Sequence, residues 1–201
     1  SDTPEAIARA AELYKQGNAL IDAGKHEASE AAYRASWEAH RTPQTAANLG
    51  MLERTSGKPR DAAEHLQFAI DAYPIDARPA GLVLLRDELA QARRAIGTLI
   101  VRSTRPARVL IQGSPRGATG DGPIYVAPGA VVVQVELEGF EPHAETVQIA
   151  AGEERTIEVK LGARMPFPGP LPPGDVYRSS PLASTRVWDD GSSSAIAVMR
   201  V

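Results

Sequence analysis

The sequence predicts an α+β protein with two domains, in which an array of helical hairpins precedes a small antiparallel β-sandwich. Three observations lead to this fold class. A pattern of glycine and apolar residues recurs at an offset of 33 between residues 10 and 75. The period of the apolar residues changes from about 3.6 to about 2 near Thr98. Beyond that point, short apolar segments are separated by clusters of turn-forming residues.

The repeated pattern predicts two helical hairpins within residues 1–97. The equivalent positions are Gly17 and Gly50, Gly24 and Gly57, and Tyr33 and Leu66. Because glycine readily ends a helix, each repeat is expected to consist of two helices separated at Gly24 or Gly57. The repeats then span residues 10–42 and 43–75, and repeats of this length are typical of helical arrays.

A fifth helix is expected at residues 80–96, where apolar residues recur at spacings of three and four. They are Leu82, Leu85, Leu89, Ala92 and Ile96. This spacing places them on one face of a helix. A repeat array needs a final helix to cover its last exposed face, so we interpret this segment as a capping helix.

The β-domain is expected at residues 98–162, because apolar and polar residues alternate there. The inward-facing positions of three predicted strands are Ala107, Val109 and Ile111, then Val131, Val133, Val135 and Leu137, and then Ile157, Val159 and Leu161. Such alternation is typical of strands that are buried on one face. The glycine-rich segment 113–122 is expected to be a hairpin loop. Several short strands at regular spacing predict a small sandwich.

The helical repeat resembles the tetratricopeptide (TPR) family over about residues 10–76. In that family a small residue lets the first helix of a hairpin approach the second, and two further small residues let the pair nest. Ala62 and Ala69 hold the latter positions in the second repeat, which Pro74 closes. The first repeat has Ser29 and Ser36 there instead.

The β-domain resembles the PEGA family in the order and spacing of its proline and glycine steps. The matching residues are Pro106-Ala107, Gly113, Ala127-Pro128-Gly129, Gly139-Phe140-Glu141-Pro142 and Gly152. The resemblance implies a first strand at residues 99–103 and a closing strand at 156–161. PEGA-like domains often occur outside the cytoplasm, so the resemblance also implies a location in a bacterial cell envelope.

The TPR resemblance implies a peptide-binding groove on the first helix of each hairpin. The residues expected to face this groove are Tyr14, Asn18, Ile21, Asn48, Met51 and Arg54. In some family members, asparagines at the positions of Asn18 and Asn48 bind a peptide's main chain or its terminal carboxylate. Tyr14, Ala77 and Gly81 replace the cations of such carboxylate-binding sites. We therefore expect an extended peptide or a helix as the ligand. The alternative is that the repeats only scaffold the β-domain.

Residue patterns for catalysis are missing from the sequence. The chain has no cysteine and no GxSxG motif, and its histidines do not have the spacing of metal ligands. These histidines are His26, His40, His65 and His143, and we expect them to be exposed. The sequence therefore predicts no catalytic residue, no metal site and no cofactor, which means that the protein is not expected to be an enzyme.

Charge and the chain ends bear on partners and location. The net charge is −3 and no segment is strongly basic, so a nucleic-acid partner is not expected. The start at Ser1 suits a processed or trimmed chain. Residues 163–201 are expected to be a Pro/Gly/Ser-rich spacer with an apolar end at Ala195–Val201, either a short strand or the beginning of a membrane helix.

Together these patterns predict a non-catalytic protein-protein interaction module or scaffold of a bacterial cell envelope. We expect it in the periplasm or another extracytoplasmic compartment, with a membrane anchor only if sequence continues beyond Val201. Its partner is expected to be a protein or peptide in the groove. The alternative is a peptidoglycan- or carbohydrate-binding protein that contacts wall material through the β-domain, where Tyr125 and Phe140 are the aromatic residues available.

Overall fold

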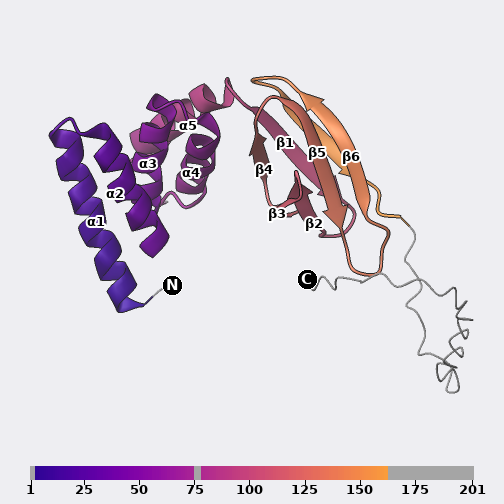
Figure 1. The fold of residues 1–201 in the computed structure, drawn as a ribbon, viewed down its shortest axis with the longest axis horizontal. Helices are drawn as coiled ribbons and strands as arrows, with labels where there is room; N and C mark the ends of the chain where they lie inside the picture. The colour runs from indigo at the N-terminus through magenta and orange to yellow at the C-terminus, as the bar shows by residue number, and fades with distance from the viewer. Residues whose placement is uncertain (1–2, 75–77, 163–201) are drawn as a thin grey trace, which may run out of the picture. The chain divides into compact units, whose positions relative to one another are not determined.

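A computed structural model describes residues 3–74 and 78–162 and confirms the two-part α+β architecture (Figure 1). The helical region contains α1 Pro4–Asp22, α2 His26–Ala39, α3 Pro43–Thr55, α4 Pro59–Asp71 and α5 Pro79–Arg93. The predicted spacer and tail at residues 163–201 lie outside the described residues, and so does Ala77.

The breaks within the two hairpins occur at Gly24 and Gly57, as the repeat pattern predicts, whereas α1 begins at Pro4, before the predicted start at residue 10, and α5 ends at Arg93, before the predicted end at residue 96. Gly24 and Gly57 follow α1 and α3 with φ angles of +70° and +75°, a left-handed conformation that glycine adopts at little cost. Thr3 and Thr42 cap the starts of α1 and α3, because each side-chain oxygen accepts a hydrogen bond from a backbone amide of the first turn. A proline follows each threonine, as is common at the first helical position.

Each hairpin contains a close approach of its two helices at a glycine. A Cβ atom added to Gly17 would lie 2.5 Å from Cε1 of Tyr33, and one added to Gly50 would lie 2.7 Å from Cγ of Leu66. Carbon atoms do not approach so closely without a shift of their surroundings. Gly17 and Gly50 are equivalent in the sequence repeat, and so are Tyr33 and Leu66. The offset of 33 therefore reflects the same helix contact in both hairpins.

The two serines of the first hairpin form hydrogen bonds across it. Ser29 Oγ donates to the carbonyl oxygen of Gly17 at 2.8 Å, and Ser36 Oγ donates to that of Ala10 at 2.9 Å. Alanines hold the equivalent places in the second hairpin. Because each buried hydroxyl has a partner, serine is tolerated where the repeat otherwise uses alanine.

The β-region contains two sheets. Strands β1 Gly97–Ser103, β4 Pro123–Val126 and β7 Glu154–Val159 form one sheet in the order β4-β1-β7. Strands β2 Arg108–Ile111, β3 Ser114–Ala118, β5 Gly129–Glu136 and β6 His143–Ile149 form the other in the order β3-β2-β5-β6. All pairs are antiparallel except β1 and β7, which are parallel. The two sheets are therefore mostly antiparallel, as expected, and β1 and β7 are the exception because they are connected through the second sheet and not by a hairpin.

Strands β3, β4 and β6 were not expected from the sequence. Strand β3 lies inside the segment expected to be a loop, and β4 is short and begins with a proline. Only two residues of β6, Val147 and Ile149, are buried. Glycine, proline and sparse burial weaken the alternation by which a strand is recognised.

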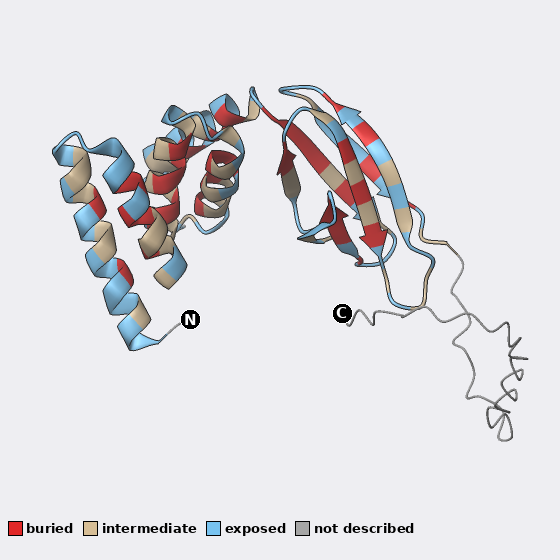
Figure 2. Ribbon diagram, viewed as in Figure 1, coloured by how far each residue is buried: buried red, intermediate tan, exposed pale blue. Residues whose placement is uncertain are grey.

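The predicted inward-facing residues of both sheets form one core. Val109, Val133 and Val135 are fully buried, and Leu99 and Ile157 of the other sheet belong to the same cluster. Buried residues alternate with more exposed ones along β5 (Figure 2). The alternation in the sequence therefore corresponds to the two faces of a half-buried strand.

Tyr125 corrects one expectation, because it is not an exposed aromatic residue. Its exposed fraction is 2%, and it packs in a cluster that includes Leu66 and Leu85 of the helical region. Its hydroxyl donates a hydrogen bond to Oε1 of Gln67 at 2.9 Å. Burial raises the pKa of the Tyr125 hydroxyl to about 12. This ring is therefore unavailable for stacking on a sugar.

We expect Gly50→Val to lower the free energy of unfolding by about 1–3 kcal/mol, because the added side chain overlaps Leu66. Urea denaturation followed by far-UV circular dichroism measures this change. Ala28→Val is the matched control, since it adds the same side chain at an exposed position of α2. We expect the control to change stability by less than about 1 kcal/mol. Equal losses in the two variants would contradict the close approach at Gly50.

Candidate functional site

Two hollows lie between α1 and α3 and share Asn18. The first, which we call the amide hollow, has a volume of about 490 Å³ and is lined by Asn18, Ile21, Asp22, Tyr33, Asn48, Met51 and Leu52. The second, which we call the apolar hollow, has a volume of about 450 Å³, and its lining includes Ile7, Ala10, Ala11, Tyr14, Lys15 and Thr45. Because Asn18 borders both hollows, we treat them as one surface and call it the α1/α3 groove.

The structure brings five of the six predicted groove residues to this surface. They are Tyr14, Asn18, Ile21, Asn48 and Met51. Arg54 lines neither hollow, and its Nε atom donates a hydrogen bond to the carboxylate of Glu88 in α5. Its charge is therefore engaged by α5.

Hydrogen bonds join four polar side chains of the groove. The Tyr33 hydroxyl donates to Oδ1 of Asn18 at 2.6 Å. The Nδ2 atom of Asn48 donates to the hydroxyls of Tyr14 and Tyr33, at 3.2 Å in each case. The two tyrosine rings lie 5.6 Å apart between centroids. The two amides are therefore oriented by tyrosines from α1 and α2.

This network leaves one donor and one acceptor unused. Among the described residues, Asn18 Nδ2 and Asn48 Oδ1 have no hydrogen-bond partner. Neither is a buried unsatisfied atom, so both reach solvent. An amide nitrogen donates and an amide oxygen accepts. Together they match the two polar groups of a peptide main chain.

The protonation of Tyr33 supports this arrangement. Burial is the largest effect on the Tyr33 hydroxyl and raises its pKa, and the negative charge of Asp22 adds to the rise. The hydrogen bond from Asn48 opposes these effects without reversing them. The hydroxyl therefore remains protonated at neutral pH and keeps donating to Asn18.

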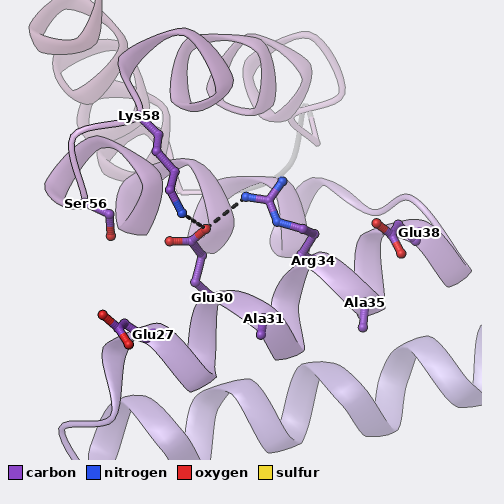
Figure 3. A pocket seen from close by; sticks show the side chains of 8 residues that line it. All are labelled: Glu27, Glu30, Ala31, Arg34, Ala35, Glu38, Ser56 and Lys58. Carbon is purple, nitrogen blue, oxygen red and sulfur yellow. Dashed lines mark hydrogen bonds and ion pairs between the residues drawn. The ribbon is translucent and has the colours of Figure 1, made fainter.

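A third hollow, of about 680 Å³, lies along α2 (Figure 3). In it Oε1 of Glu30 accepts hydrogen bonds from Nζ of Lys58 at 2.6 Å and from Nη2 of Arg34 at 2.9 Å. Burial alone would raise the pKa of Glu30, but the hydrogen bonds and charges of Lys58 and Arg34 outweigh it and lower the pKa. The cations that line this hollow are thus already engaged with carboxylates.

Glu53 of α3 is fully buried and connects three helices. Its Oε1 atom accepts a hydrogen bond from Nη2 of Arg34 at 2.7 Å, and its Oε2 atom lies 2.6 Å from Nδ1 of His65. The expectation that His65 is exposed is wrong, because its side chain is only 14% exposed and its ring packs edge-on against Trp37. The three residues therefore link α2, α3 and α4.

Metal-binding clusters and membrane-spanning helices are both absent from the described residues. No group of three or more histidine, aspartate and glutamate side chains is placed to hold a metal ion in residues 3–74 and 78–162. In the same ranges, no helix combines the length and the apolar character that a membrane span requires.

Sequence analysis missed several groove residues that periodicity could have found. Ile7, Ala11 and Asp22 lie at helical spacing from Tyr14 and Asn18, so all five occupy one face of α1. In the sequence, Tyr33 was recognised only as the repeat equivalent of Leu66. Its hydroxyl contacts depend on the placement of α2 against α1 and α3, and no local pattern reveals that placement.

Comparisons with known proteins identify the β-region. The family model for the PEGA domain matches residues 96–164, a range that contains all seven described strands, so the β-region is a PEGA domain. No tetratricopeptide family match covers the five-helix region. A comparison of the chain with curated proteins found no significant match.

We expect Glu30→Gln to lower the free energy of unfolding at neutral pH by about 1 kcal/mol, because it weakens charge-assisted hydrogen bonds that are partly exposed. The pKa of Glu30 is lower in the folded chain, so its stabilising contribution exists above the unfolded carboxyl pKa and is lost as pH falls through the folded value. Urea denaturation should therefore show the difference from wild type shrinking below about pH 4.

Glu38→Gln is the control for this experiment, because Glu38 lines the same hollow and forms no ion pair within the described part of the chain. We expect it to change stability by less than about 0.5 kcal/mol at every pH. A Glu30→Gln effect that stays constant from neutral to acidic pH would contradict the role of the charge.

Proposed function

We propose that the chain is a non-catalytic protein-interaction module whose helical region binds an extended segment of a partner protein in the α1/α3 groove. The observation that carries this proposal is the unused donor and acceptor of Asn18 and Asn48, held in place by two tyrosines. An extended main chain has unpaired N–H and C=O groups, whereas those of a helix bond to one another. The pair therefore favours an extended ligand over a helical one.

The hairpin geometry supports the TPR resemblance. We propose that α1 to α4 form two TPR-type hairpins and that α5 caps them. The close approaches at Gly17 and Gly50 occur at equivalent places in the two hairpins. In TPR proteins the first helices of the hairpins line the binding groove, and α1 and α3 are those helices here. Tyr14 and Gly81 supply no cation at the positions noted above, which favours an internal segment over a free carboxylate.

The length of the groove limits the length of the segment. Ile7 and Asp22 mark its two ends on α1. At about 1.5 Å per helical residue, these positions are about 22 Å apart. An extended chain advances about 3.3 Å per residue, so about seven residues would occupy the groove.

Binding to wall material through the PEGA domain is the weaker alternative. Of the two aromatic residues considered for it, Tyr125 is buried. The other, Phe140, contacts the guanidinium of Arg105 at 5.5 Å from the ring centroid. Tyr125 therefore offers no stacking platform, and Arg105 already lies over one face of the Phe140 ring.

We propose the cell envelope as the location of the protein, and the PEGA match supports this proposal. The protein encoded by the full-length gene should be recovered with the envelope or periplasmic fraction when it is tagged and the cells are fractionated. A cytosolic marker protein is the control for leakage between fractions. Recovery in the cytosol alone would contradict this location and would leave the groove proposal unchanged.

A phage-displayed library of random peptides, selected on the immobilised full chain, tests the groove. The enriched peptides are synthesised with a blocked C-terminus, and their affinities are measured by fluorescence anisotropy. We expect Ala11→Trp to weaken binding by about tenfold or more, because the indole would occupy the apolar hollow. Ala31→Trp is the matched control, since it places the same side chain in the hollow on α2 and should leave the affinity unchanged.

Two results would contradict the groove proposal. One is that no peptide is enriched over selection on an unrelated protein. The other is that Ala11→Trp and Ala31→Trp reduce affinity equally, which would place binding elsewhere. Circular dichroism of both variants establishes that they are folded before the affinities are compared.

A further inference from the structure

We infer that the partner segment carries a lysine or arginine at the end of the α1/α3 groove that contains Asp22. This inference rests on the proposed function and specifies the chemistry of the bound segment. Asp22 is the charged residue in the lining of the amide hollow, where the other side chains are amides, a tyrosine and apolar groups. Within the described ranges it forms no hydrogen bond or ion pair.

The position of Asp22 in α1 strengthens its negative potential. It is the last residue of the helix, and the last turn contains no basic residue. The C-terminal end of a helix carries a partial negative charge, so a carboxylate there adds to that charge and gains nothing from the helix. A cation placed in the amide hollow would interact favourably with the Asp22 carboxylate and with the negative end of the helix.

Arg54, the cation that the sequence analysis expected in the groove, does not neutralise Asp22. Arg54 lines neither hollow and pairs with Glu88. Since Asp22 lines a hollow whose other side chains are uncharged, the complementary charge can come from a ligand. A guanidinium or ammonium on the bound segment fits that requirement.

The opposite end of the groove has a different character. The apolar hollow is lined by Ile7, Ala11 and Tyr14, and Ile7 is 44% exposed. Lys15 adds a positive charge to the lining of this hollow, which disfavours a second basic residue there. A segment with a basic residue at one end and an apolar residue at the other therefore fits in one direction only, because reversal would place like charges together.

Charge variants of Asp22 test this inference on the peptides selected as above. We expect the groove-dependent peptides to carry lysine or arginine toward one end, and Asp22→Asn to weaken their binding about three- to tenfold at low salt. The difference should shrink as the salt concentration rises, because screening acts on the charge alone. Asp71→Asn is the matched control, since Asp71 is also the last residue of a helix and lies outside the groove lining.

A charge exchange provides a second measurement. Asp22→Lys should weaken binding of the basic peptide further, and replacing the peptide's basic residue with glutamate should restore affinity for this variant but not for wild type. Peptides that are lost on Ala11→Trp but bind Asp22→Asn as tightly as wild type would overturn the inference and leave the groove proposal intact. Failure to recover any peptide sensitive to Ala11→Trp would overturn both.

Discussion

The close approach of α1 and α2 at Gly17 is the contact on which the candidate site depends. Without a side chain at Gly17, the Tyr33 ring lies directly against α1. Its hydroxyl then reaches Asn18, the next residue along the chain, at 2.6 Å. In the second hairpin Leu66 occupies the equivalent place and contributes packing alone. The first hairpin therefore uses a helix contact that both hairpins share, and this contact orients a polar group in the groove.

A second interaction determines how the two hairpins meet. Glu53 is fully buried, and a buried carboxylate is stable only when its charge is paired and its oxygens are hydrogen-bonded. Arg34 of the first hairpin and His65 of the second meet this requirement. Asn48 lies on the same helix as Glu53, so the cluster that holds α3 also holds Asn48 against Tyr33. Glu53 with its ionic partners and Asn48 of the groove thus lie on different faces of one helix, α3.

The sequence revealed the features that local rules produce, and it did not reveal contacts between distant segments. Helix ends at Gly24 and Gly57 follow from backbone conformation, and the groove positions were implied by the TPR resemblance. Tyr125 is buried in a cluster with residues of the helical region, and its hydroxyl bonds to Gln67, which is 58 residues away. Likewise, the contact of His65 with Glu53 requires two helices to pack. The sequence therefore indicated that Tyr14 and the two asparagines face the groove, but not that Tyr14 and Tyr33 orient these asparagines.

The size of the groove implies that selectivity depends on its polar groups. About seven extended residues bury far less surface than a stable protein interface, so binding by apolar contact alone would be weak. The preformed network of Asn18, Tyr33 and Asn48 reduces the ordering that binding requires, because these side chains are already held in place. In the proposed complex, this network pairs with main-chain groups, which all peptides share. In the proposed complex, discrimination among segments therefore depends on the charges of the two hollows, because Asp22 lines the amide hollow and Lys15 lines the apolar hollow.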